Sequence, residues 1–273
     1  MPSVPSVLEI RRFLDKPVAA INRKRFYPRS NVHVDLVLLA LVSKSVVVGR
    51  AVWRLVESRF YEEAFGLTRT LMDIYLTVRY IANQDSLSRA EKFVNFYARD
   101  YVGWVEILEK YYASTPVTRR KDHAEMLEKA KDFKDPHKWT GLGDQTRRMA
   151  MEEDVYETRQ TGRPATAEFD YKVIYRWTSH YVHATVVSLR SHAVERREAF
   201  VVHSTKGESV RLRELALFNT LTYLAKIVIC GFRGLKSSLP TRLSDKWDSV
   251  VKSFFELRKR RIRSRQIETR ALP

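Results

Sequence analysis

The sequence predicts an all-α protein, a multi-helix bundle of about eight or nine helices with one small β-hairpin near residues 199–212. Apolar residues recur at helical spacing through most of the chain. The strict alternation typical of strands is confined to one stretch, AFVVHSTKGESVRLREL. We expect residues 1–257 to form a single helical domain with a candidate lid at 117–168, followed by a basic and partly disordered tail at 258–273.

The first half of the chain contains four predicted helices. The first is short and amphipathic, and a basic loop that ends at Pro28 follows it. Ser30 or Asn31 can cap the second helix, because short polar side chains accept hydrogen bonds from the unpaired N–H groups of a first turn. These helices are expected over about 5–21, from after Asn31 to 57, 59–82 and 86–112.

The second half is more polar as far as Glu168 and helical beyond it. Segment 117–168 has weak apolar periodicity and contains Asp135-Pro136 and the glycines of WTGLG, which favours a flap or lid. The alternating stretch turns at Lys206-Gly207-Glu208, which favours a hairpin. Helices are expected over about 118–133, 144–154, 170–196, 214–232 and 243–265.

Composition favours a cytoplasmic protein. The single cysteine, Cys230, lies in an apolar run, which excludes a disulfide framework and a cysteine metal site. The N-terminus has no basic region followed by a long apolar stretch, so we expect no secretory signal. Charged residues interrupt the most apolar segment, 32–56, whereas a membrane span needs about 20 nearly uncharged residues. We expect a core helix there and no membrane span.

The formal net charge of +17 and the pI of about 10.0 indicate a polyanionic partner. Nucleic acid is the commonest polyanion in a cytosol. The C-terminal tail can bind backbone phosphate or an acidic membrane surface, or it can be simply solvated. The candidate nucleic-acid-binding residues in this tail are Arg258, Lys259, Arg260, Arg261, Arg263 and Arg265.

One predicted helix contains the densest group of reactive side chains in the sequence. Four of them are spaced four apart, namely Tyr171, Tyr175, Ser179 and His183, and Arg176 and His180 lie between them. In a regular helix each residue advances by about 100°, which directs Tyr171 and Tyr175 toward the core. The same geometry places Arg176, His180 and His183 on one shared face.

Such a face is suited to phosphate chemistry without a metal. A histidine can take or give a proton, and a guanidinium can hold a phosphate while charge develops on it. RNA supplies its own nucleophile in the 2′-hydroxyl. We predict His183 as general acid or base and Arg176 and His180 as phosphate-side groups, with no metal and no cofactor.

Residues that would support the candidate catalytic groups are predicted on a second helix and on the same helix, among the four residues spaced four apart, Tyr171, Tyr175, Ser179 and His183, which we call the ladder. Arg69 and Asp73 are four residues apart, which is typical of a solvated pair worth a few tenths of a kcal/mol. Alternatively Asp73 faces His183 and orients its imidazole. We favour a structural polar cluster that links the two helices and includes Tyr175 and Ser179.

Two family resemblances follow from these motifs. Arg176 and His183 have six residues between them, which resembles the Arg/His motif of HEPN, a superfamily found in many prokaryotic ribonuclease toxins. The order of AFGLTRTLMDIYLTVRYIA, WTGLGDQTRRMA and YKVIYRWTSHYVHAT resembles a bacterial helical family of unknown function over about residues 35–200. The first resemblance implies a metal-independent RNase of toxin or phage-defence type. The second implies a helical domain and little about activity.

Two function classes remain open at this stage. The first is a nucleic-acid-directed protein, an endoribonuclease in its sharpest form, with RNA favoured as partner. The alternative is a non-catalytic interaction or nucleic-acid-binding module, in which the Tyr/Ser/His ladder is a structural polar network. A small-molecule enzyme is a third option. A homodimer and a cognate antitoxin or regulatory protein are further candidate partners.

Overall fold

The computed structural model describes residues 32–111, 123–134, 138–141, 144–162, 165–183, 193–196, 199–202 and 210–235. The predicted helical fold class is confirmed for these residues. The helices are α2 (Val32–Glu57), α3 (Tyr61–Asn83), α4 (Ser86–Tyr111), α5 (His123–Ala130), α6 (Gln145–Thr161), α7 (Ala167–Asp170), the π-helix η2 (Tyr171–Tyr175), α8 (Arg176–Val182) and α10 (Val210–Gly234). The predicted count of eight or nine is not confirmed, because the predicted first and last helices, at 5–21 and 243–265, lie outside the described residues.

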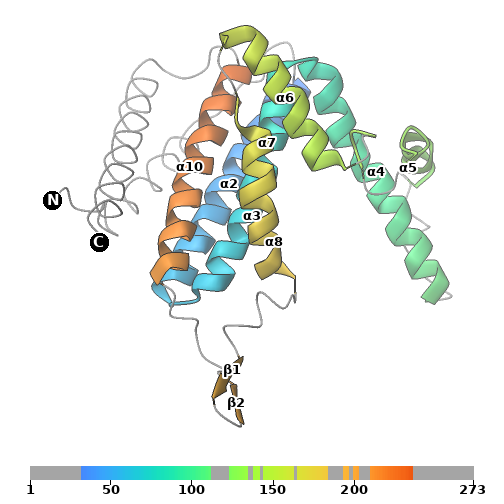
Figure 1. Cartoon of the computed structure of the whole chain (residues 1–273). Coiled ribbons are helices and arrows are strands. Elements are labelled where there is room, and N and C mark those ends of the chain that lie inside the picture. The colour runs from blue at the N-terminus through green and yellow to red at the C-terminus, as the bar shows by residue number, and fades with distance from the viewer. Residues whose placement is uncertain are drawn as a thin grey trace.

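Three long helices, α2, α3 and α10, run side by side and form the centre of the bundle (Figure 1). Helix α3 is the most enclosed of them, since nearly every residue from Leu71 to Ile81 is buried. A helix that is apolar on most sides must be covered on most sides. The buried side chains that join the three helices include Leu38, Val42, Leu71, Leu76, Val78, Leu224 and Ile227.

Helices α2 and α10 are antiparallel and approach closely at two glycines of α10. A Cβ atom at Gly231 would lie 2.7 Å from Val42 Cγ2. One at Gly234 would lie 2.6 Å from Leu38 Cδ1 and 2.8 Å from Ala82 Cβ. Because no Cβ fits at these positions, glycine allows α10 to pack into the groove between α2 and α3.

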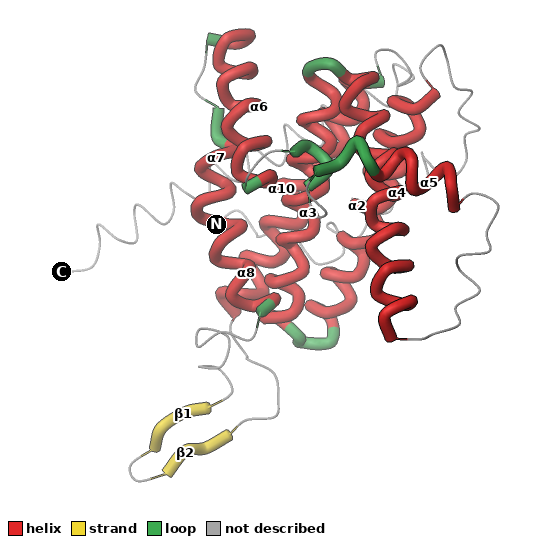
Figure 2. The backbone as a smooth tube through the Cα atoms, turned by 90° about the vertical axis from the view of Figure 1, so that its right-hand side faces the viewer, coloured by secondary structure: helices red, strands yellow, loops and turns green. Residues whose placement is uncertain are grey.

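The remaining helices lie around this centre. In Figure 2, α4 runs along one side of the bundle with α5 against it, and α6, α7 and α8 occupy another side. Trp139, from the predicted tryptophan-glycine segment, is buried between α3 and α4. Its ring makes edge contacts with Tyr80 at 5.8 Å and with Phe93 at 5.2 Å. These aromatic contacts fix the chain that leads into α6.

The predicted helix over 170–196 is wrong in two respects. The chain passes through a π-helical turn at Tyr171–Tyr175, and helix α8 ends at Val182. His183 has extended backbone angles, φ −104° and ψ 146°. The β-branched residues Thr185, Val186 and Val187 follow in the sequence, and such side chains favour extended backbone over helix.

The predicted hairpin at 199–212 is not confirmed. The structure pairs strand β1 (Ala193–Arg196) with strand β2 (Ala199–Val202) in antiparallel register, and the turn predicted at 206–208 lies outside the described residues. Residues from Val210 onward are helical, because the buried positions Leu212, Ala216 and Asn219 continue the helical spacing of α10 toward its start.

Helices α2 and α10 are long and apolar enough to cross a membrane by length and composition alone. About half of each apolar window is buried, 50% for His33–Glu57 and 56% for Leu212–Gly231. Core helices of soluble proteins pass the same test. The prediction that residues 32–56 form a core helix agrees with the burial of Val37, Leu38 and Val42. The two apolar helices are compatible with either a soluble or a membrane protein.

The close approach at Gly234 predicts a destabilising Gly234→Ala substitution. The new methyl group would overlap Leu38 and Ala82, and overpacking of this kind costs about 1–3 kcal/mol. Gly103→Ala is the matched control, because nothing lies within 4 Å of a Cβ at this position in α4. The control should stabilise the protein by about 0.5–1 kcal/mol through helix propensity. Urea unfolding of both variants measures the difference, and equal effects would contradict the close packing.

Candidate functional site

The guanidinium of Arg69 joins two residues of the predicted ladder. Arg69 Nη2 donates a hydrogen bond to Tyr175 Oη at 2.7 Å, and Arg69 Nη1 lies 3.0 Å from His183 Nε2. The guanidinium carbon also lies 4.5 Å from the centroid of the Tyr175 ring, which adds a cation–π contact. Helix α3 therefore holds Tyr175 and His183 through one side chain.

The Arg69 contact gives one ring nitrogen of His183 a hydrogen-bonding role. A guanidinium has only N–H donors, so Nε2 is the acceptor in this hydrogen bond, which corresponds to the tautomer with its proton on Nδ1. Because the pair is exposed, the ring lies within reach of a solute.

The π-helical turn brings Tyr171 and Tyr175 into a stack. A π-helix has hydrogen bonds from residue i to residue i+5, so residues four apart lie closer to one line than in an α-helix. The two rings are 4.9 Å apart and inclined by 25°. Tyr171 Oη donates to Asp144 Oδ1 at 3.1 Å, and Ser179 Oγ donates to the carbonyl of Tyr175 at 2.6 Å. Both tyrosines are partly buried, whereas the helical wheel predicts them in the core.

Two aromatic residues of α8 anchor this helix to α3. Trp177 and Tyr181 make edge contacts with Phe65, with ring centroids 5.1 Å and 5.4 Å away. Gly66 permits the approach, since a Cβ there would lie 3.3 Å from the backbone of Tyr181. Phe65, which packs against α8, and Arg69, which contacts Tyr175 and His183, are thus four residues apart on α3.

Asp73 lies one turn after Arg69 and is partly buried. Burial raises the pKa of the Asp73 carboxyl to about 6, and the nearby Arg69 partly opposes this shift. In the described part of the chain no hydrogen bond joins Asp73 to another residue, so the predicted contact with His183 is not among the interactions of this site. His183 contacts Arg69 instead.

The other predicted site residues are not all brought together. Arg176 and His180 are exposed on α8, and His183 leaves the helix, so the helical face predicted to unite the three is interrupted at Val182. The six predicted tail residues, Arg258, Lys259, Arg260, Arg261, Arg263 and Arg265, lie outside the described residues. Within the described ranges no group of three or more His, Cys, Asp or Glu residues is arranged to hold a metal ion.

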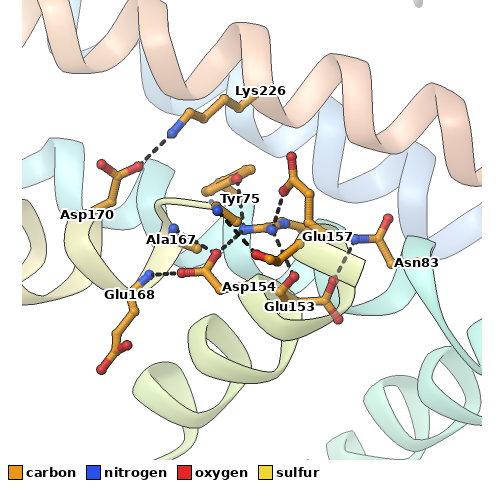
Figure 3. A network of polar contacts seen from close by, with 12 residues as sticks. Tyr75, Asn83, Glu153, Asp154, Glu157, Ala167, Glu168, Asp170 and Lys226 are labelled. Carbon is orange, nitrogen blue, oxygen red and sulfur yellow. Dashed lines mark hydrogen bonds and ion pairs between the residues drawn. The ribbon is translucent and has the colours of Figure 1, made fainter. Parts of the chain in front are cut away.

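The sequence analysis missed a buried ionic network between α3 and α6, shown in Figure 3. Arg79 is only 2% exposed and forms ion pairs with Asp154 at 3.2 Å and with Glu157. Its Nη2 atom also donates to the carbonyl of Glu153 at 3.0 Å. Burial acts to lower the pKa of Arg79, and Tyr75, Glu157, Asp154 and Glu153 together raise it above its ordinary value. The guanidinium therefore stays charged.

Glu153 extends the network toward α4. Its side chain is fully buried, and it accepts hydrogen bonds from Asn83 at 2.6 Å and Arg89 at 3.0 Å. Burial raises the pKa of the Glu153 carboxyl, and these donors with Arg79 oppose the shift. The available sequence signal was an arginine within the apolar run of α3 and the acidic cluster Glu152-Glu153-Asp154 in an otherwise polar helix. The contacts tie α6 to α3, while the lid predicted over 117–168 stays a prediction.

Comparison with known proteins identifies a family without an assigned activity. A model of a family of unknown function, DUF5677, matches residues 35–200. This match supports the predicted resemblance to a family of unknown function over those residues, and it gives no support for the HEPN resemblance or for a bacterial source. No curated protein and no solved structure matches the chain.

The buried carboxyl of Asp73 predicts a pH-dependent gain of stability in Asp73→Asn. The folded-state pKa of about 6 lies above the ordinary value of 3.8, so ionisation costs more in the folded protein and its stability falls as pH rises from about 4 to 6. Above pH 6 the neutral asparagine should be more stable by roughly 2–3 kcal/mol, and below pH 4 the gain should vanish.

Denaturant unfolding of the wild type and of Asp73→Asn at pH 4 and pH 8 tests this expectation. Asp100→Asn is the control, because Asp100 is an exposed aspartate on α4. It should change stability little at either pH. A gain in Asp73→Asn that is equal at both pH values would contradict a raised pKa.

Proposed function

The chain belongs to the family of unknown function DUF5677, and we propose that it is a nucleic-acid-directed protein that cleaves RNA without a metal ion. One observation carries the proposal. Arg69 contacts Nε2 of the exposed His183 ring at 3.0 Å, so a cation that can bind phosphate and a nitrogen that can accept a proton lie within one hydrogen bond of each other. The net charge of +17 supplies the attraction for a polyanion.

The proposed reaction is transfer of the phosphodiester to the neighbouring 2′-oxygen. A phosphate oxygen takes over a hydrogen bond from Arg69, which frees Nε2 of His183. Nε2 then accepts the proton of the 2′-hydroxyl, and the resulting oxygen attacks the adjacent phosphorus. The bond to the 5′-oxygen breaks, and this oxygen takes a proton from a water molecule, which in turn takes back the proton from the His183 ring. The products are a 2′,3′-cyclic phosphate and a free 5′-hydroxyl.

Neighbouring residues of the site have supporting roles in this proposal. Tyr175 accepts a hydrogen bond from Arg69 and thereby fixes the direction of the guanidinium. The exposed Arg176 and His180 on the same helix provide further positive or proton-donating groups on the phosphate side. The single cysteine favours a reducing, cytoplasmic compartment, and the basic charge favours RNA as the partner. A role of toxin or phage-defence type rests on the resemblance of Arg176 and His183 to the HEPN motif alone.

A non-catalytic module is the second candidate function. It is favoured by the hydrogen bonds of the ladder, because the hydroxyl groups of Tyr171, Tyr175 and Ser179 all form hydrogen bonds within the protein. Such a network can serve only to join α8 to α3. In that case the basic charge would bind nucleic acid without cleaving it.

We expect RNA cleavage in EDTA that is lost in His183→Ala. Removing a general base costs about 10²–10⁴ in rate, so cleavage should fall at least a hundredfold. Arg69→Lys should reduce cleavage as well. The planar guanidinium can donate to Tyr175 and to a phosphate at the same time, whereas a lysine ammonium lacks this fixed arrangement of donors. The measurement is gel analysis of total RNA beside single-stranded DNA, with analysis of the product ends.

His33→Ala is the matched control, because His33 is an exposed histidine on another helix, α2. It should cleave as the wild type does. Salt-sensitive retention of RNA by all variants without cleavage would reject the ribonuclease and support the module. DNA cleavage would also reject it, because DNA lacks the 2′-hydroxyl.

A further inference from the structure

Asp154 uses both of its carboxylate oxygens to connect α3 with the helix that bears the candidate site. Its Oδ1 atom accepts hydrogen bonds from Arg79 Nη1 at 3.2 Å and from the N–H of Ala167 at 2.9 Å. Its Oδ2 atom accepts from the N–H of Glu168 at 2.8 Å. Figure 3 shows Asp154 beside Ala167 and Glu168.

The two amides belong to the first turn of α7, where helical N–H groups have no partner within the helix. An N-cap side chain normally accepts from such groups, but Thr166 at the cap position makes no side-chain hydrogen bond to them. Asp154 on α6 takes this role from another helix. Its negative charge also suits the positive end of the helix dipole.

Helix α7 continues directly into η2 and α8, so residues 167–182 form one uninterrupted helical rod. Its first turn is fixed through Asp154 to Arg79 of α3. Toward its other end, Arg69 of α3 contacts Tyr175 and His183. Arg69 and Arg79 are ten residues apart on one helix, or about 15 Å. The rod is therefore attached to the same helix at two levels.

We propose that Asp154 is a positioning residue that sets the placement of the rod, and with it the contacts of Tyr175 and His183 with Arg69. Glu157 provides the comparison that separates this role from simple neutralisation of Arg79. Both carboxylates pair with the buried guanidinium, but only Asp154 also accepts from the amides of α7. The ion pair between Lys226 and Asp170, at 2.6 Å, is a further attachment of the rod, to α10.

The test compares Asp154→Asn with Glu157→Gln, since each removes one negative charge beside Arg79 and keeps the shape of the side chain. In Asp154→Asn the amide NH₂ group replaces one acceptor oxygen, so one donor of Arg79 or α7 loses its partner. Amide hydrogen exchange should become at least tenfold faster over residues 167–183, with α10 unchanged. Glu157→Gln should leave exchange over 167–183 close to that of the wild type.

Nitrogen-15 NMR of the His183 ring adds a readout that a purely structural role would not change. Loss of the Arg69 hydrogen bond should shift the Nε2 signal in Asp154→Asn and leave it in place in Glu157→Gln. Equal behaviour of the two variants, or uniformly faster exchange throughout the protein, would overturn the proposal.

A rescue variant covers the case in which Asp154→Asn folds poorly. Thr166→Asp places a carboxylate at the N-cap position itself, where it can accept from the first-turn amides without neutralising Arg79. Combined with Asp154→Asn, it should restore slow exchange in the first turn, at 167–170, but not the link to Arg79, so the Nε2 signal of His183 should stay displaced. Return of that signal to its wild-type position would show that the cap alone sets the placement of the rod, and would overturn the proposal.

The exchange and NMR measurements do not depend on the ribonuclease proposal. If RNA cleavage is observed, Asp154→Asn should reduce the cleavage rate at saturating RNA about tenfold with little change in RNA retention. If no cleavage is observed in the wild type, the proposed function fails while the positioning role is still decided by exchange over 167–183.

Discussion

The buried guanidinium of Arg79 is the constraint on which the rest of the arrangement depends. Taking a charge out of water costs several kcal/mol unless partners surround it, and removing one partner of such a pair typically costs about 3–5 kcal/mol. Apart from Tyr75 on α3 itself, the partners of Arg79 come from α6, which must therefore lie against α3 with Asp154, Glu157 and a backbone carbonyl facing inward. An apolar side chain at position 79 would leave these carboxylates without this cation. The position of α6 is thus fixed by charge as well as by apolar packing.

The position of α6 in turn determines where the candidate site lies. Asp154 holds the first turn of α7, and the rod from α7 to α8 then lies along α3, where Phe65 receives Trp177 and Tyr181. The π-helical turn lies between these two attachments, and Thr178 stabilises this region by donating to the carbonyls of Ile174 and Tyr175. A local change of helical register is the means by which a rod fixed at both ends can also stack Tyr171 on Tyr175. Helix α3 therefore serves as the common scaffold, with Arg79 at one level and Arg69 at another.

The sequence predicted the long helices well and the site only in part. Helices α3 and α4 begin and end within about two residues of their predicted bounds, because sustained apolar periodicity is a strong local signal. The wheel drawn for 170–196 assumed one regular α-helix, whereas the π-turn has no clear local signal and the end at Val182 has only a weak one, the β-branched residues that follow in the sequence. The partners of Arg79 on α6, and Tyr175 and His183 that Arg69 contacts, lie more than 70 residues away along the chain, and a single sequence does not encode such pairings in any readable spacing. A polar link between the two helices that contained both Arg69 and Asp73 was expected, and in the structure Arg69 makes the hydrogen bonds.

Asp73 bears on the choice between a reactive site and a structural cluster. Its carboxyl pays a desolvation cost and gains no hydrogen bond within the described part of the chain, although a neutral residue at this position would avoid that cost. Stability alone does not favour such a group, whereas a charge beside Arg69 adjusts how strongly the guanidinium attracts an anion. Ionised Asp73 weakens this attraction, and neutral Asp73 leaves the full positive charge of Arg69 for a phosphate. If Arg69 binds a phosphate, its affinity would therefore be lower when Asp73 is ionised than when it is neutral.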